Sequence, residues 1–279
     1  MKKIKNPLIK RIPKELIGDW KKYLVVFLFL VLTIGFVSGM YVANESMITS
    51  ANEGVTKYKQ EDGHFELKKQ ADATLLSAIE TGEKADFKAT KTTLYENFFR
   101  NEEEDYNNDG KKDGTIRVFA KTKDINLACM LQGSFPQKAD EIAIDRMHAD
   151  NVGIKVGDTV TVSGETYKVV GLLAYVNYST LHEKTTDLMF DALKFDVAMV
   201  TQDGFDRLHK SIHYTYAWKY ETEPADEAGE KTRSDNFMRA LLTQVVVADN
   251  ELEDYTPKYG NPAINFATDD MGSDNAMGG

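Results

Sequence analysis

The clearest pattern along the chain is an unbroken apolar run over residues 23–43. It holds 21 residues without a charge, with Lys21 and Lys22 before it and Glu45 soon after it. At about 1.5 Å per residue a helix of this length spans about 32 Å, which matches a bilayer core. A core helix would show a polar face, and a signal peptide has an apolar stretch of only about 7–15 residues. The run therefore predicts an uncleaved transmembrane helix.

The charges on the two sides of this run differ in sign. Residues 1–22 contain eight Lys or Arg against two acidic residues, whereas the rest of the chain contains 26 basic and 42 acidic residues. Basic residues beside a membrane helix favour the cytoplasmic side. We expect a cell-membrane protein with its N-terminus in the cytoplasm and residues 44–279 outside. The acidic outer part argues against nucleic acid as a partner.

The leader over residues 1–22 carries apolar side chains at helical spacing. Ile12, Leu16, Trp20 and Tyr23 recur every three or four residues, with basic residues on the other sides. This pattern is typical of an amphipathic helix lying on membrane lipid. A basic flank without fixed structure is the alternative interpretation.

Residues 44–272 alternate between helical and strand periodicity, which predicts an extracytoplasmic α+β domain. We expect residues 46–59 to continue the membrane helix. Further helices are predicted over residues 66–79, 146–151, 203–212 and 237–247, and residues 221–234 read as a loop. Strands are predicted within residues 87–100, 115–122, 126–132, 140–145, 159–163, 167–173, 196–201 and 218–220. Residues 257–279 read as irregular, and their last seven residues, 273–279, as a tail leading toward a second membrane helix.

The strongest strand signal is a hairpin over residues 153–173, GIKVGDTVTVSGETYKVVGLL. Val160 and Val162 share one face of the first strand, so we expect both to be buried. Gly164 and Glu165 are predicted to form the two-residue turn, with a positive φ at Gly164.

An acidic stretch after residue 100 suggests a cation site. Asp105, Asn107, Asp109 and Asp113 occupy positions 1, 3, 5 and 9 of a calcium-binding loop, with Gly110 at position 6. Position 8 is a lysine and position 12 an isoleucine, which departs from an EF-hand. The alternatives are a looser calcium loop between two strands, helped by the acidic residues 102–104, and a solvated hairpin loop.

Other chemistry in the chain is sparse. Cys129 lies in an apolar run and is expected to be a buried structural thiol. His209 and His213 are spaced by four on the predicted helix, yet Lys210 stands where a zincin needs glutamate. No nucleophile–base set and no phosphate-loop motif occurs, so we expect no enzyme activity and no cofactor beyond calcium.

Three motifs in order resemble those of the FtsX-like permeases of ABC transporters, the MacB-type group. They are Leu-x-Gly-x-x-Pro, a Glu-Ile-Ala strand and a Val-Gly-Asp-Thr hairpin that ends in Val-Val-Gly. They lie at residues 131–136, 141–143, 156–159 and 169–171. The resemblance extends to the order of leader, membrane helix and outer domain.

This resemblance implies a fold of the MacB periplasmic-core type and a permease subunit that couples movement of a cytoplasmic ATPase to the outer domain. ATP would be bound by that partner, and a second permease copy is a further expected partner. Such permeases typically have four membrane helices. The alternative is a membrane-anchored extracellular binding or sensor module.

Overall fold

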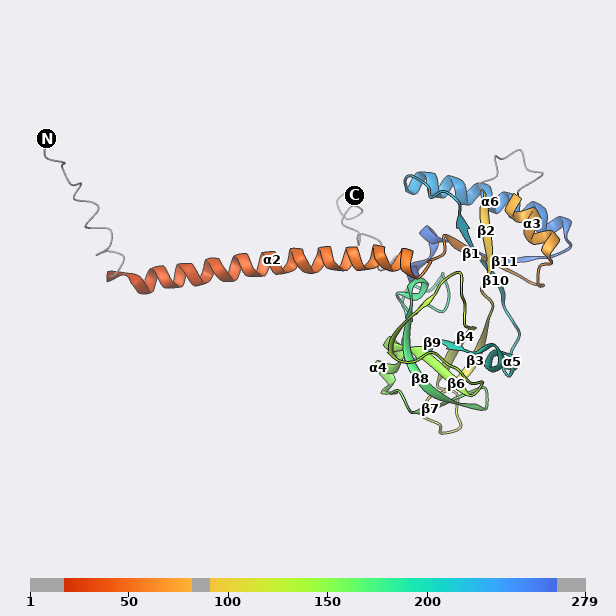
Figure 1. Cartoon of the computed structure of the whole chain (residues 1–279), viewed down its shortest axis with the longest axis horizontal. Coiled ribbons are helices and arrows are strands. Elements are labelled where there is room, and N and C mark those ends of the chain that lie inside the picture. The colour runs from red at the N-terminus through yellow and green to blue at the C-terminus, as the bar shows by residue number, and fades with distance from the viewer. Residues whose placement is uncertain (1–17, 82–90, 265–279) are drawn as a thin grey trace. The chain divides into compact units, whose positions relative to one another are not determined.

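The structure is a computed structural model that describes residues 18–81 and 91–264. The predicted tail over residues 273–279 and most of the predicted leader helix lie outside these ranges. The chain divides into two units, residues 1–51 and 52–279. The first contains most of helix α2, Trp20–Lys57, which continues without a break into the second (Figure 1).

Helix α2 has the length and composition of a membrane span. Within the described residues, the segment Trp20–Val42 is the one helix long and apolar enough to cross a bilayer, and its side chains are exposed in the protein alone. The helix then runs on for another 15 residues to Lys57. The predicted helical extension beyond the apolar run is therefore confirmed.

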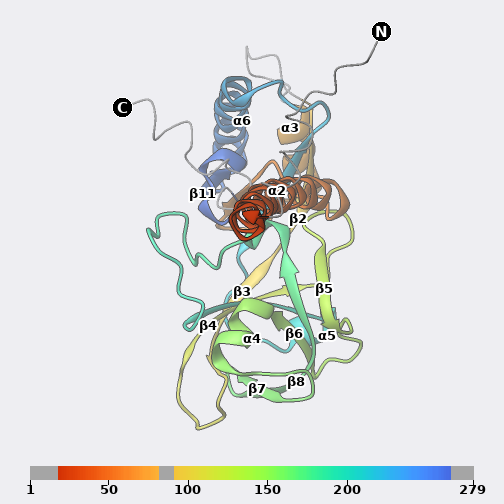
Figure 2. The same cartoon turned by 90° about the vertical axis from the view of Figure 1, so that its left-hand side faces the viewer.

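The outer unit contains a four-stranded antiparallel sheet in the order β11-β1-β10-β2. These strands are Leu252–Pro257, Gly63–Leu67, Tyr214–Tyr220 and Thr92–Glu96. Helices α3, Ala73–Thr81, and α6, Glu227–Val247, lie on one side of this sheet (Figure 2). Their apolar side chains form one core with the sheet. The aromatic rings of Phe65, Trp218 and Phe237 stack and tilt against one another in this core.

The second sheet has the order β5-β8-β6-β9-β4-β3-β7, and β7 also pairs with β8. The strands in chain order are β3 Phe99–Asp105, β4 Gly114–Ala120, β5 Ala128–Gly133, β6 Glu141–Asp145, β7 Thr159–Val162, β8 Glu165–Tyr175 and β9 Phe195–Val200. Because β7 bonds to both β3 and β8, the sheet closes into a barrel and β5 is left as an extension beside β8.

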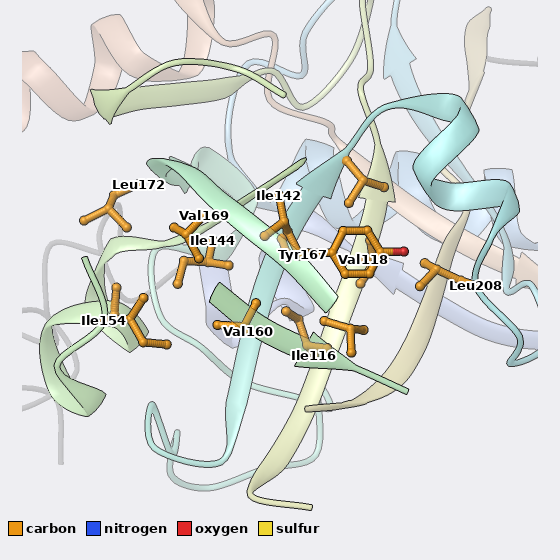
Figure 3. Packing of buried hydrophobic residues seen from close by; sticks show 14 of the residues in the cluster. Ile116, Val118, Ile142, Ile144, Ile154, Val160, Tyr167, Val169, Leu172 and Leu208 are labelled. Atoms are coloured by element: carbon orange, nitrogen blue, oxygen red, sulfur yellow. The ribbon is translucent and has the colours of Figure 1, made fainter. Parts of the chain in front are cut away.

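Alternate residues of the barrel strands fill its interior. Ile116, Val118, Val160 and Val162 are buried there together with Tyr167 of β8 (Figure 3). The opposite face of the same strands packs a separate core around Phe119 and Phe195. The α+β class is thus confirmed, as is the predicted burial of both valines of the hairpin.

The hairpin turn differs by one residue from the prediction. Val162 pairs with Glu165, so the turn residues are Ser163 and Gly164. Both have positive φ, 47° and 87°, which is the arrangement of a type I′ turn. The positive φ at Gly164 is confirmed, but Glu165 belongs to strand β8. A small polar serine tolerates the left-handed region that the sequence assigned to the glycine alone.

Several predicted element boundaries are wrong, and strand β11 was not predicted. Residues 66–72 form the end of β1 and a turn before α3, and residues 227–234 are helical although their polarity suggested a loop. Residues 252–257 form strand β11. Helix α5, Gln202–Asp206, is capped by Thr201 and ends early. In each case packing against a sheet or a side-chain cap overrode the local pattern.

Candidate functional site

A polar cleft of about 370 Å³ lies between the two sheets of the outer unit. One wall comes from β1, β10 and β11, and the other from β3 and β4 and the segment after β8. Three histidines, His64, His182 and His213, line this cleft together with Arg117. A concave site with several converging polar groups is the usual form of a binding site.

Arg117 is the main cationic group of the cleft. Its guanidinium donates hydrogen bonds to the side-chain oxygen of Asn101 (3.0 Å), the hydroxyl of Tyr178 (2.7 Å) and the carbonyl of Glu183 (2.9 Å). It also lies over the ring of Phe99, 4.3 Å from the centroid. Among the described residues, all its hydrogen-bond acceptors are uncharged. The positive charge is therefore held in place by neutral acceptors, in a cleft that Glu66 and Asp254 also line.

Two histidines of the four-stranded sheet are each held by a carboxylate. His213 Nδ1 lies 2.6 Å from Glu66 Oε1, and its ring stacks on Phe99 at 4.5 Å. His64 Nδ1 lies 2.6 Å from Glu61 Oε1, while its Nε2 lies 3.8 Å from Asp254 Oδ2.

The pKa of His64 is raised above its usual value. Burial lowers this pKa, and so does the charge of Arg117, but the carboxylates of Glu61 and Asp254 outweigh both. The two carboxylates therefore favour the imidazolium form of His64 on the wall of the cleft.

The segment directly after α2 joins the helix to both sheets. Helix α2 closes with Lys59 at a φ of 51° and with a hydrogen bond from the Gln60 N–H to the Val55 carbonyl, as in a Schellman motif. Residues 58–62, which follow, are here called the junction. The junction begins at the fixed end of a helix and is not a flexible linker.

One side of the junction is bonded to the segment before β5 and to β5 itself. The fully buried Glu61 donates its backbone N–H to the Asn126 side chain (3.0 Å), and its carboxylate accepts from the Asn126 amide (2.5 Å). The backbone of residues 126 and 127 donates to the carbonyls of residues 59 and 58, and the hydroxyl of Tyr58 donates to Cys129 Sγ at 2.9 Å. Glu61 also holds His64, so the junction contacts the cleft wall.

The other side of the junction is bonded to the four-stranded sheet. Asp62 accepts from Lys219 Nζ at 2.7 Å and from the backbone N–H of Tyr220 at 2.8 Å. Its own backbone bonds to the carbonyl of Trp218 and the N–H of Lys258. Within five residues the chain is thus attached to both sheets of the outer unit. No sequence pattern predicts this attachment, because Asp62 and Asn126 stand in no recognisable motif.

The predicted calcium loop forms the connection between β3 and β4. Asp105 accepts hydrogen bonds from the N–H groups of Asp109 (3.1 Å) and Gly110 (2.8 Å), and Asp113 accepts from Tyr106 and Asn107. These bonds fold the four predicted oxygen ligands into one exposed loop. Calcium binding there stays a prediction.

The prediction that the acidic residues 102–104 assist a calcium site is wrong for two of the three. Glu102 and Glu104 are buried because they alternate toward the barrel interior, and Glu103 alone is exposed. Glu102 accepts hydrogen bonds from Ser163 and from the backbone of Lys210. Glu104 lies instead beside His148 and Asp196 inside the barrel.

Two further predictions concern the spacing of His209 and His213 and the burial of Cys129, and each differs in part from the structure. His209 and His213 do not share a helix, because α5 ends at Asp206 and His213 forms a bridge to Phe99. Cys129 is only half-buried, and its sulfur accepts the hydrogen bond from Tyr58. The two histidines therefore form no pair on one helix, and Cys129 makes a structural contact as expected but is less buried than predicted.

Comparison with known proteins finds distant similarity. No family model and no curated protein matches the chain. Among solved structures, it is similar to the extracellular domain of the noncanonic ABC-type transporter YknZ from Gram-positive bacteria. The identity is 13%, with 68% of this chain and 100% of that chain covered and a TM-score of 0.34. It is also similar to the periplasmic region of MacB from Actinobacillus actinomycetemcomitans, at 9% identity, 74% and 94% coverage and a TM-score of 0.36.

The second of these structures carries the name of the group that the three sequence motifs resemble.

Proposed function

We propose that this chain is the first membrane helix and the extracytoplasmic domain of an FtsX/MacB-like permease, and that it couples movement of a cytoplasmic ATPase to the outer domain. The chain itself carries no catalysis in this proposal, and ATP is bound by the partner. The basic leader stands on the cytoplasmic side, with the acidic domain outside. Three motifs between residues 131 and 171 support the same family.

The observation that carries the proposal is the junction. A single helix, Trp20–Lys57, leads into five residues that are hydrogen-bonded to both sheets. Asn126 and Asp62 are nearly inaccessible to solvent, so these bonds lie in a low-dielectric environment where breaking them is costly. A displacement of the outer end of α2 is therefore passed to both sheets and is not absorbed by a loose linker.

The test uses the native complex isolated from membranes through a tag on this chain. Asn126→Gly removes both side-chain bonds to Glu61, and Asn108→Gly serves as a matched control. Asn108 also has a positive φ, 57°, but is exposed and bonds to β7. We expect Asn126→Gly to uncouple ATP hydrolysis from the outer domain, seen as loss of the substrate-dependent part of the ATPase rate. Equal rates in both variants would refute the role of the junction.

The orientation is tested separately by labelling with a membrane-impermeant maleimide. In a Cys129→Ser background, Lys111→Cys places a thiol in the exposed loop of the outer unit, and Lys3→Cys places one in the leader. We expect intact cells to label only the first and permeabilised cells to label both. Labelling of the leader in intact cells would refute the proposed topology.

Arg117 favours a second function for the chain, namely a membrane-anchored binding module for an anionic ligand. The guanidinium lies in the cleft with uncharged acceptors only, among the described residues. Calorimetric titration with phosphate and with acetate should give binding that Arg117→Gln removes. Arg207→Gln is the control, because Arg207 is exposed and pairs with Glu165. Binding without any ATPase in the isolated complex would favour this function over the first.

A further inference from the structure

Three ionisable side chains converge inside the barrel from three separate elements. Glu104 lies on β3, His148 on α4, Arg146–Val152, and Asp196 on β9. All three are completely buried, and one potential ligand atom from each lies within 4.8 Å of the others. The three residues are separated by 44 and 48 positions along the chain, so no sequence motif identifies them as a group.

His148 is oriented toward the other two side chains. Its Nδ1 lies 2.8 Å from the carbonyl oxygen of Ala192, which accepts only if Nδ1 carries the proton. In the neutral ring, Nε2 then presents a lone pair toward Glu104. A backbone carbonyl that fixes the far nitrogen of the ring is the usual support of a metal-binding histidine.

The two carboxylates differ in their hydrogen bonds: Asp196 is bonded through one oxygen, and Glu104 through neither, among the described residues. Asp196 Oδ1 accepts from the backbone N–H groups of Asp145 (3.1 Å) and Val197 (2.7 Å). Asp196 Oδ2, both oxygens of Glu104 and His148 Nε2 have no hydrogen-bond partner among the described residues. Buried polar atoms are normally satisfied, and each one left open is costly. Four such atoms in one place point to a bound ligand.

The distance between His148 Nε2 and Glu104 Oε2 indicates whether a metal ion or a proton lies between these atoms. His148 Nε2 lies 3.4 Å from Glu104 Oε2. A charge-assisted hydrogen bond between these groups would be about 2.7–2.9 Å long. Two ligands at about 2.0–2.2 Å from a tetrahedral zinc ion are about 3.3–3.5 Å apart, and the His148–Glu104 pair has this separation. A divalent cation would also neutralise the two buried carboxylates.

We infer that Glu104, His148 and Asp196 bind one divalent transition-metal ion of the zinc type inside the barrel. One imidazole and two carboxylates form a donor set that suits zinc. The ion would tie α4 to β3 and β9 at a point where no side chain is accessible, so its role is structural. This inference is independent of the proposed coupling function.

The experiment uses the full chain purified in detergent without chelator. Metal analysis should find about one zinc per chain, and the chelator-treated protein should regain a melting temperature about 5 °C or more higher when zinc is added back. Replacing zinc by cobalt(II) should give visible absorption bands that the metal-free protein lacks. The cobalt measurement uses only the wild-type chain, so its result does not depend on whether a variant folds.

Glu104→Gln and Asp196→Asn keep the side-chain shape and should abolish both the zinc content and the zinc-dependent shift. His209→Gln is the matched control, because this imidazole is exposed. Wild-type protein with neither zinc nor a shift would overturn the inference in favour of a protonated cluster. Zinc retained by the two carboxylate variants, or lost with His209→Gln, would overturn it in favour of surface binding.

Discussion

Replacing Asn126 by glycine tests the junction at its most buried contact. The side chain is 1% exposed and makes two hydrogen bonds to Glu61, which is itself fully buried. Glycine removes both bonds but tolerates the φ of 46° found at this position. The change therefore separates the loss of the contacts from any backbone strain.

The structure sets the size of the effect. A net contribution of about 1 kcal/mol for the neutral bond and about 1.5–3 kcal/mol for the bond to the carboxylate gives a loss of about 2–4 kcal/mol in the free energy of unfolding. For a domain of this size that corresponds to a fall of about 5–15 °C in the melting temperature. Asn126→Ala should cost about 1–2 kcal/mol more, because alanine is strained in the left-handed region.

The assay is thermal unfolding of the full chain followed by tryptophan fluorescence, since Trp218 is buried in the core of the four-stranded sheet. Asn108→Gly is the control and should lower the melting temperature by less than a third as much, because its bonds are exposed to water. An equal fall in the two glycine variants would refute the view that the junction is a tightly bonded connection.

Three further predictions concern the hairpin, the cleft and the acidic loop. Gly164→Ala should destabilise the chain by about 1 kcal/mol through its positive φ alone, since nothing obstructs the added methyl group, while Glu165→Ala should be near neutral. The pKa of His64 is raised in the folded state. Its stabilising effect relative to His64→Gln should therefore be complete below about pH 6.5 and lost as the pH rises through the folded pKa, as measured by denaturant unfolding. Millimolar calcium should raise the melting temperature, and Asp105→Ala with Asp109→Ala should remove that rise; no rise would leave a solvated loop.

Much of the architecture follows from periodicity. The apolar run predicts the membrane helix, and alternation predicts most strands of the barrel, because each strand buries one face or both. The elements that were mispredicted have weak local signals. The polar first third of α6 is helical through its Asp226 cap and its continuation into a buried face, and β11 forms because β1 offers it an edge.

The site was far less predictable. The junction depends on Asn126, and the buried group depends on Glu104, His148 and Asp196. The fold brings these residues to their partners across long separations in the sequence. No spacing rule identifies such contacts. Glu104 in particular looked like part of an exposed acidic run, although strand alternation in β3 turns it inward.

The most direct test of coupling is the distance across the cleft, measured by electron paramagnetic resonance between spin labels at Thr185→Cys and Glu253→Cys in a Cys129→Ser background. Thr185 lines the cleft on the barrel side, and Glu253 lies on β11 of the other sheet. In the native complex, ATP and Mg²⁺ should shift the distance distribution, and Asn126→Gly should abolish the shift. The same distribution with and without ATP in the otherwise unchanged chain would contradict coupling of the ATPase to the outer domain.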